Sequence, residues 1–406
     1  MSATSDETQT MPRSSELRVN LSDAAFIEDP YPVYARLRAE DPIHVIGDKV
    51  LISRYADYCA ICTDKRMSND RKEIWEKAVG KNVIYEHRTT TLNFRDPPDH
   101  TRLRRHISRF FVPPNVRSFE PFIQSTVDEL LDAIEEKGGG DLVKDFAFPL
   151  PAMVIGELLG IPKEIRHNFY KWGEVSAATQ EPHVRPQVIT DGIATYDEML
   201  AILGELAEQR LREPRGDLIS AMVASVGLND GMTMKEVLHN AAFMVNAGHE
   251  TTMNTILNGL NALFRFPDQM SLLRGDPGLI ETAVDEMLRY DSPVQMNRRM
   301  PKVDVEIGGK KIAAGSDMLM AIGSANRDEA QFPQADRFDV RRTPNRHVAF
   351  GTPNIHFCMG APFARLEVQT AINALLKKFP RLAPASPPVR SKRLRFRGFE
   401  QMQVTA

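Results

Sequence analysis

The stretch HVAFGTPNIHFCMGAPFARLE (residues 347–367) places one of the chain's three cysteines in a loop of Gly, Pro and Asn. Apolar residues then recur at helical spacing from Ala361 to Phe379, where Phe379-Pro380 ends the pattern, so a helix is predicted to begin just after Cys358. Amide groups at a helix N-terminus favour a thiolate, which is the form of cysteine that binds metals or attacks electrophiles. A lone buried cysteine is also often inert, so the loop by itself leaves both interpretations open.

The composition is that of an ordinary globular protein. The chain has 406 residues, of which 42% are hydrophobic and 26% charged, and its formal net charge of -3 provides no general attraction to nucleic acid or to an anionic membrane. The N-terminal sequence lacks the features of a secretory signal, and no segment offers about 18 uninterrupted apolar residues. We expect a cytoplasmic protein with a disordered tail over residues 1–16, a single domain over residues 17–406, and neither a nucleic-acid nor a membrane partner.

The other two cysteines form C-A-I-C, from Cys59 to Cys62. This spacing occurs in redox pairs and in half of many zinc sites. No second cysteine pair or clustered histidines follow at zinc spacing, and the flanking residues are typical of a short helix. A structural role is therefore expected.

Hydrophobic periodicity predicts a mainly helical protein with small sheets. Alternation over residues 42–53 indicates a hairpin, residues 98–290 have a helical pattern with scattered prolines and glycines, and residues 303–325 return to strand chemistry around Gly308-Gly309. No linker long enough to separate two domains is present.

The longest predicted helix runs from Thr233 to Phe266. It opens with a capping box and is apolar nearly all round, which is typical of a helix through the middle of a large core. Its centre, NAGHETT (residues 246–252), contains Glu250 and Thr251, where packing would favour Leu. These polar residues either face water or lie beside something polar and reactive.

Glu286 and Arg289 are three residues apart on a helix with many apolar positions. Such pairs are common on helix surfaces and contribute only tenths of a kcal/mol there. A buried pair would need a third partner, and Arg337 is a candidate.

The segment DPPDHTRLRRHISRFF begins a helix near Pro98 whose basic residues divide between two faces. His100 and Arg104 lie on the face that carries apolar side chains, where they require an anion. The opposite face forms a compact basic patch or simply a solvated surface, and it carries Arg102, Arg105 and Arg109.

His356 stands two residues before Cys358, and Arg298-Arg299 follow a segment that reads as buried. Together with His100 and Arg104, these groups form a cationic set with almost no acidic partners. Two carboxylates on one bound ligand would satisfy them. A thiolate metal ligand combined with a dianionic prosthetic group describes haem.

With these motifs the chain resembles the cytochrome P450 family of haem-thiolate monooxygenases, specifically its soluble bacterial members. The resemblance runs from PYPVYARLRAEDP at residue 30 to the C-terminus, and it rests on an ordered set of motifs: HTRLR, AGHETT, E-x-x-R, FPQADRFD and H-x-C-x-G. It implies the cytochrome P450 fold, with the long central helix lying over the haem.

The resemblance also implies roles for single residues. Cys358 corresponds to the haem iron ligand, and Glu250 and Thr251 correspond to the catalytic acid and alcohol. Partners of the haem propionates would be His100, Arg104, Arg299 and His356, with Arg298 as the alternative to Arg299. The structural triad would be Glu286, Arg289 and Arg337. Substrate would contact residues 71–92 and 165–190 and also Phe243, Asn246, Ala247, Val294 and Met296.

The cysteine loop departs from the usual pattern of the family. Phe350 lies eight residues before the cysteine rather than seven, and Pro353-Asn354 stand where Gly is common. Proline has a fixed φ and no amide hydrogen, so the hydrogen bonds around the sulfur are expected to differ.

The implied function is insertion of one oxygen atom from O2 into a small or medium apolar organic molecule, with haem b as cofactor. Electrons would come from NAD(P)H through a reductase and an acidic ferredoxin that docks on Arg102, Arg105 and Arg109, and a monomer is expected. A peroxide-driven or isomerising haem-thiolate enzyme is an alternative, although it has less use for Glu250 and Thr251. A non-enzymatic haem sensor is another, although no output domain is evident.

Overall fold

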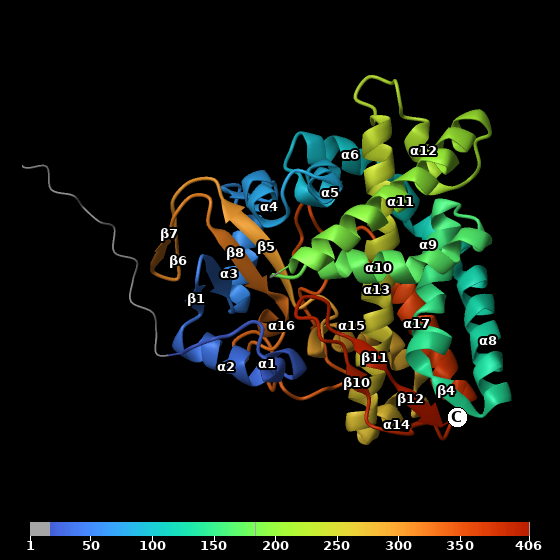
Figure 1. Cartoon of the computed structure of the whole chain (residues 1–406). Helices are drawn as coiled ribbons and strands as arrows, with labels where there is room; N and C mark the ends of the chain where they lie inside the picture. The colour runs from blue at the N-terminus through green and yellow to red at the C-terminus, as the bar shows by residue number, and fades with distance from the viewer. Residues whose placement is uncertain (1–16, 183, 406) are drawn as a thin grey trace, which may run out of the picture.

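A computed structural model describes residues 17–182 and 184–405. The predicted tail over residues 1–16 lies outside the described residues. Helices dominate the described part and strands gather in small sheets, as the sequence predicts (Figure 1). In this part of the chain, no helix combines the length and apolarity that crossing a membrane requires.

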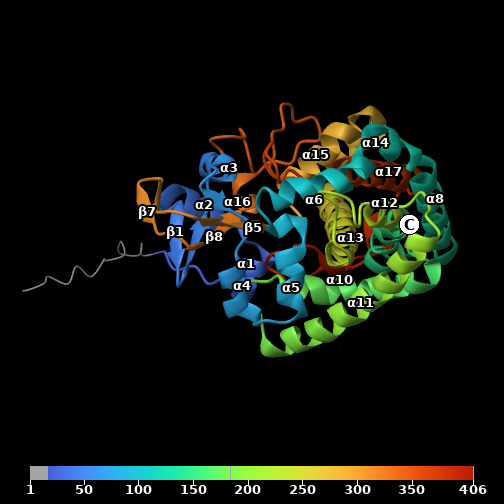
Figure 2. The ribbon, with the colours of Figure 1, turned by 90° about the horizontal axis from the view of Figure 1, so that it is seen from above.

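The long helix α13 (Met234–Arg265) runs through the helical part of the molecule, and Figure 2, which looks along it, shows the other helices around it. The predicted capping box is confirmed. Oγ1 of Thr233 accepts from the amide of Glu236 at 3.2 Å, and the Glu236 carboxylate accepts from the Thr233 amide at 2.8 Å. The α-helices packed most extensively against it are α9 (Pro149–Leu159), α10 (Phe169–Thr179), α11 (Pro186–Arg212), α15 (Ile280–Tyr290) and α17 (Ala361–Lys378).

Gly248, in the middle of α13, allows a close approach to α9. A Cβ at this position would lie 2.9 Å from Cδ1 of Ile155. Glycine costs about 1 kcal/mol in helix propensity relative to alanine, yet α13 remains helical through this point. The close packing of the two helices therefore accounts for a residue that local propensity alone would disfavour.

The largest sheet joins segments from the two ends of the sequence. Its strand order is β1-β2-β8-β5-β3, with β2 and β8 parallel and the other neighbours antiparallel. The strands are β1 (Ile43–Ile46), β2 (Lys49–Ile52), β3 (Met67–Ser68), β5 (Met296–Pro301) and β8 (Asp317–Ala321). The hairpin predicted over residues 42–53 is confirmed as β1 and β2.

The second predicted hairpin consists of β6 (Val305–Ile307) and β7 (Lys310–Ile312). Gly308 and Gly309 form its turn with φ of 54° and 77°, a region that favours glycine. The other small sheets are β10 (Val389–Arg390) with β11 (Phe399–Gln401), and β4 (Gly139–Asp141) with β12 (Gln403–Thr405) and β9 (Ala383–Pro384).

The remaining α-helices pack around these elements. They are α1 (Ala24–Glu28), α2 (Tyr31–Glu40), α3 (Tyr55–Thr63), α4 (Lys72–Val79), α5 (Val83–Thr90), α6 (Asp99–Ile107), α7 (Pro113–Ser118), α8 (Glu120–Lys137), α12 (Leu218–Val223), α14 (Pro267–Gly275) and α16 (Ile322–Ala325).

Cys59 and Cys62 both lie on α3, as the sequence predicts, and pack against an apolar cluster between this helix and the large sheet. Both are free thiols, and burial raises the pKa of each. Among the described residues, no group of three or more His, Cys, Asp and Glu side chains is placed to hold a metal ion. These contacts fit the structural role expected of the pair.

Candidate active site

The cysteine loop is held by Asn354 rather than by additional glycines. Its side-chain oxygen accepts from the amide of His356 at 2.7 Å, and its Nδ2 donates to the carbonyl of Cys62 at 3.1 Å. The amide of Cys358 donates to the carbonyl of Phe350 at 3.1 Å. Asn354 thus orders a loop that departs from the glycine-rich pattern of the family.

Cys358 lies just before α17, as predicted, and its side chain is exposed to a cavity. The expectation of a thiolate favoured by the helix N-terminus is only half right. Amides of Gly360 and Ala361 and the charge of Arg104 act to lower the pKa of the thiol, but burial outweighs them and raises it. A coordinating metal deprotonates a thiol outright, so iron would supply what the helix terminus does not.

The cavity beside Cys358 has a volume of about 270 Å³. The predicted site residues that line it are His100, Arg104, Phe243, Ala247, Val294, Arg298, Arg299, His356 and Cys358. They come from α6, α13, β5, the segment just before β5 and the cysteine loop, so the fold brings together groups that are far apart in the sequence.

His100 and His356 lie side by side at this cavity, with ring centroids 4.1 Å apart. Burial lowers the pKa of His100 to about 4 and that of His356 to about 2, and the charge of Arg104 contributes to both shifts. Neither ring nitrogen of the buried His100 has a hydrogen-bond partner among the described residues. Buried polar atoms of this kind require a partner, and a ligand carboxylate would provide it.

Two arginines strengthen the case for an anionic group here. Arg104 donates to the carbonyls of Ile355 and Phe357 at 2.9 and 2.8 Å. Arg299 donates to the carbonyl of Arg298 at 2.8 Å and has no carboxylate partner within the described chain. Arg298 instead lies 3.4 Å from the carboxylate of Asp317, which makes Arg299 the better partner for a ligand. The donors fit the two carboxylates of haem.

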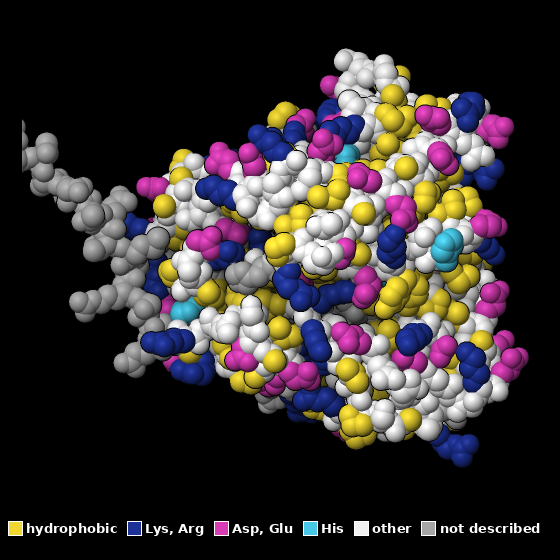
Figure 3. All heavy atoms as spheres, in the orientation of Figure 1, with side chains coloured by type: hydrophobic (Ala, Val, Ile, Leu, Met, Phe, Trp, Pro, Cys, Tyr) yellow, Lys and Arg dark blue, Asp and Glu magenta, His cyan; other side chains and the backbone are white. Residues whose placement is uncertain are grey.

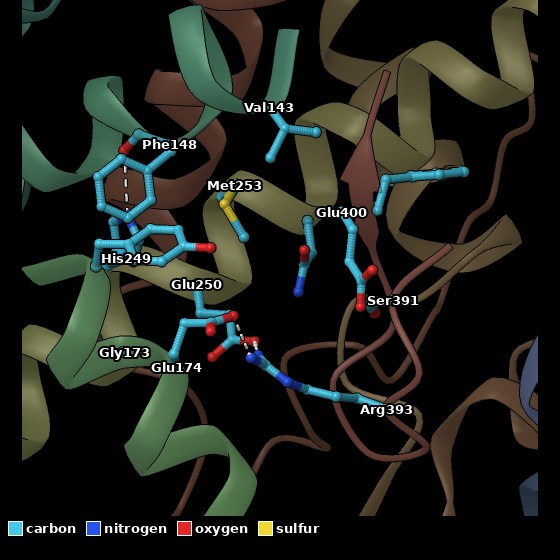
Figure 4. Close-up of a pocket in the computed structure, with 13 residues that line it drawn as sticks. Val143, Phe148, Gly173, Glu174, His249, Glu250, Met253, Ser391, Arg393 and Glu400 are labelled. Atoms are coloured by element: carbon cyan, nitrogen blue, oxygen red, sulfur yellow. Dashed lines mark hydrogen bonds and ion pairs between the residues drawn. The ribbon is translucent and has the colours of Figure 1, made fainter. Parts of the chain in front are cut away.

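Glu250 extends from α13 toward a second group of charges, shown in Figure 4. Its carboxylate pairs with Nη1 of Arg393, and Nη2 of the same arginine donates to Glu174 at 2.7 Å. Burial raises the pKa of Glu250 to about 7, although Arg393 acts to lower it. The Glu174 side chain is half exposed, so the group connects the buried carboxyl with solvent.

Thr251 lies beside a further cavity of about 140 Å³, and Oγ1 donates to the carbonyl of Ala247 at 2.8 Å. The structure places Phe243, Asn246, Ala247 and Val294 in the lining, together with parts of the predicted segments 71–92 and 165–190. Both polar atoms of the Asn246 side chain are buried and have no partner among the described residues.

Met296 is not part of this lining. As the first residue of β5 it packs into an apolar cluster with Leu319 and Ala321 of β8, and it is 1% exposed. The structure therefore does not bring Met296 together with the other predicted substrate residues. Sequence reasoning also missed Arg393 and Arg395, whose alternation with apolar residues in RLRFRGF was the available signal.

Two of the three residues predicted as a structural triad contact each other. Arg289 holds the carboxylate of Glu286 through Nε at 2.7 Å and Nη2 at 2.8 Å, and both side chains are fully buried. The third member is Arg342, whose Nε lies 3.1 Å from both Glu286 oxygens. Arg337 is exposed, and it contacts Arg289 through its carbonyl, which accepts from Nη2 at 3.1 Å, so the structure does not bring its side chain into this group.

The predicted basic patch is smaller than expected. Arg102 donates to Glu236 at 3.1 Å and to the carbonyl of Gly231 at 2.7 Å, so its charge is compensated within the fold. Arg105 and Arg109 are exposed at the C-terminal end of α6 and in the turn that follows.

Comparisons with known proteins agree with this geometry. Residues 278–396 match the family described as Cytochrome P450. The chain is 39% identical over 368 residues to the cytochrome P450 monooxygenase PikC of Streptomyces venezuelae, covering 88% of this chain and 86% of that protein. It is 35% identical over 390 residues to the biotin biosynthesis cytochrome P450 of Bacillus subtilis, covering 95% and 98%.

Solved structures show the same relationship. The crystal structure of P450BioI in complex with an acyl carrier protein ligated to hexadec-9Z-enoic acid aligns with a TM-score of 0.90 at 34% identity, covering 95% of this chain and 100% of that chain. The family implies haem-thiolate iron and the use of O2. The chain therefore belongs to the cytochrome P450 family and is a cytochrome P450 monooxygenase.

Proposed function

We propose that this monooxygenase inserts one oxygen atom into a small or medium, largely apolar organic substrate bound beside Thr251. The observation that carries the proposal is the cavity of about 140 Å³ between α13 and the C-terminal segment, which shares Phe243, Ala247 and Val294 with the cavity of Cys358. Aromatic rings of Phe94 and Phe396 contribute further apolar surface. Burial of apolar substrate surface there would provide most of the binding free energy.

Related proteins support a substrate with much apolar surface. A Vitamin D(3) 25-hydroxylase of Pseudonocardia autotrophica is 37% identical over 399 residues. A myxobacterial cytochrome P450 in complex with myristic acid aligns with a TM-score of 0.89 at 33% identity.

Haem, when bound, supplies the activation of O2 and the transfer of one oxygen atom. In the proposed arrangement Cys358 would hold the iron through its sulfur, and the carboxylates of the cofactor would be bound by His100, Arg104, Arg299 and His356. Loss of the cofactor would therefore leave several buried donors without partners.

Glu250 is proposed as the proton source. Its side chain lines both the cavity of Thr251 and the pocket shown in Figure 4, where Glu174 is half exposed. A pKa of about 7 suits a group that must take up and release protons near neutral pH. Thr251 then places the proton or a water molecule at the substrate side of α13.

Electrons are proposed to come from NAD(P)H through a reductase and an acidic ferredoxin that docks near Arg105 and Arg109. The same proposal places the enzyme in the cytoplasm as a monomer. A peroxide-driven or isomerising reaction is the remaining alternative within the haem-thiolate class.

The test uses the haem-loaded protein with a candidate apolar substrate. With NADPH, reductase and ferredoxin, NADPH should be consumed and a product carrying one atom of ¹⁸O from labelled O2 should form. Product formed only with added hydrogen peroxide, or without incorporated oxygen, would contradict the proposal and favour the alternative.

A further inference from the structure

Arg395 stands out within the C-terminal segment between β10 and β11. Its neighbours two residues away each have a carboxylate: Arg393 pairs with Glu250, and Nε of Arg397 donates to Asp291 at 2.7 Å. Nε and Nη1 of Arg395 are buried and have no hydrogen-bond partner among the described residues. Buried guanidinium nitrogens without a counter-charge are costly, which points to a partner outside the folded chain.

The backbone of Arg395 is fixed on both sides. Its amide donates to the carboxylate of Glu181 at 3.1 Å, and its carbonyl accepts from the amide of Gln295 at 2.8 Å. A β-bridge between Val294 and Phe396 holds the segment beside the start of β5. The side chain is therefore presented from a rigid position, which lowers the entropic cost of binding a ligand.

Charges around Arg395 do not neutralise it. Arg71 and Arg298 share the carboxylate of Asp317, at 3.6 and 3.4 Å. Arg88 donates to the carbonyl of Thr179 and lies over the ring of Trp75, with its Cζ 4.1 Å from the centroid. Burial lowers the pKa of Arg395 to about 10, and the charge of Arg298 contributes to that shift.

The charges of Glu181 and Glu250 act to raise the pKa of Arg395, but both carboxylates are engaged by other groups. Glu181 is held by the backbone amides of Leu394 and Arg395, and Glu250 pairs with Arg393. Arg395 lines both the cavity of Cys358 and the cavity of Thr251. An anion bound to it would lie where these two cavities meet.

We propose that Arg395 binds the carboxylate of an organic acid substrate and orients its apolar chain along Phe94, Phe243 and Val294 toward Thr251. This inference rests on the proposed function and narrows its substrate class. Arg395 would act as a substrate anchor, and oxidation would occur at a carbon separated from the carboxylate.

The experiment compares acids with neutral analogues. Saturated fatty acids from hexanoic to myristic acid, each with its methyl ester, are titrated into the haem-loaded protein, and dissociation constants are measured by calorimetry and by the shift of the Soret band. At neutral pH, at least one acid should bind about tenfold more tightly than its ester, and the preference should disappear as the acid becomes protonated at low pH.

Arg395→Gln should weaken binding of that acid by about 10- to 100-fold and change binding of the ester by less than about twofold. Arg395→Lys, which keeps the charge, should retain part of the preference. Lys392→Gln is the matched control, because it removes the same charge three residues away from an exposed side chain; it should leave the acid-to-ester ratio unchanged.

Equal binding of acids and esters to the wild type, or no binding by any acid of the series, would overturn the inference. Loss of haem from Arg395→Gln would also overturn it, since Arg395 would then serve the cofactor. These outcomes are separate from failure of the proposed function, which is judged by oxygen incorporation into a neutral substrate. A ferrous CO spectrum is recorded for the wild type and for each variant, so that only proteins with thiolate-ligated haem are compared.

Discussion

Thr251 and the adjacent Thr252 look equivalent in the sequence but face different surroundings. Thr251 lines the cavity proposed for substrate and donates to the carbonyl of Ala247 at 2.8 Å. Both threonines line a cavity of about 190 Å³ that also includes Cys358. Thr252, however, is 2% exposed and is not among the residues that line the proposed substrate cavity, and its Oγ1 donates to the carbonyl of Gly248 at 3.2 Å. A hydroxyl that places protons for oxygen transfer should therefore belong to Thr251.

Thr251→Ala should retain folding, haem content and substrate binding, because alanine has the higher helix propensity. Proton placement should fail, so most of the electrons taken from NADPH should appear as hydrogen peroxide instead of product. Product and peroxide formed per NADPH oxidised are the measurements, and Thr252→Ala is the control with near wild-type coupling. Full coupling in Thr251→Ala with loss in Thr252→Ala would reverse the assignment.

The raised pKa of Glu250 predicts that turnover depends on pH. Burial raises its pKa to about 7, so the proton-donating form predominates below that pH and declines above it. Wild-type turnover should therefore fall as pH rises through about 7, provided that electron supply is not limiting. Glu250→Gln cannot titrate, so it should be slower by about 100-fold and lose this limb of the profile.

Arg393 provides an independent check on that interpretation. Because its charge holds the pKa of Glu250 below the value that burial alone would give, Arg393→Gln should raise this pKa and move the falling limb to higher pH. An unshifted limb in Arg393→Gln, or a limb that persists in Glu250→Gln, would assign the titration to another group.

At the scale of secondary-structure elements, Glu286 and Arg289 join α15 to the irregular segment that precedes the cysteine loop. Glu286 accepts from Arg289 and Arg342, and also from the backbone amide of Asp339 at 2.9 Å. All of these contacts surround one fully buried carboxylate. The segment leading to Cys358 is thereby tied to the helical core.

Arg342→Gln should lower the free energy of unfolding by about 3 kcal/mol, because it removes one partner of a buried charge. Arg337→Gln alters an exposed side chain nearby and should change stability by less than about 0.5 kcal/mol. Urea denaturation followed by circular dichroism compares the two. Equal losses would mean that Arg337 contributes as much as the sequence suggested.

The sequence predicts elements well where periodicity and caps agree, as in α13 and the hairpin of β1 and β2. It fails where a choice depends on the path of an irregular segment. Arg337 and Arg342 are both arginines of the same meander, and only the backbone course shows which side chain turns inward. Similarly, Arg393 and Arg395 reach the site from the C-terminal segment through pairings with distant residues, which local patterns do not encode.

At the scale of the whole molecule, the surface mixes both signs of charge. The face in Figure 3 shows Lys and Arg side chains interspersed with Asp and Glu, including over the region of α6. The formal net charge is -3. Recognition of an acidic partner must therefore depend on a local group of basic residues rather than on the overall field.

Within α6 and the turn after it, the structure leaves Arg105 and Arg109 as the exposed members of the predicted patch. The side chain of Arg105 is 56% exposed and lies 3.9 Å from Asp230, a separation at which a surface ion pair contributes little. Arg102 is paired with Glu236, so it is left unchanged in the experiment that follows. We therefore expect these two exposed arginines to steer an acidic ferredoxin, as the proposed function requires.

The double variant Arg105→Glu with Arg109→Glu should slow association with an acidic ferredoxin by about tenfold at low ionic strength, because steering acts mainly on the association rate. The difference should shrink toward wild type at about 0.5 M salt, where charges are screened over a few ångströms. Arg36→Glu with Lys311→Glu makes the same change in net charge on α2 and β7, which Figure 1 places away from α6. Stopped-flow reduction of the haem-loaded protein at several salt concentrations measures both variants. A local docking site must respond more strongly to charge changes within it than to the same changes elsewhere on the surface. Equal slowing in the two double variants would therefore show that net charge, rather than the face of Arg105 and Arg109, governs association.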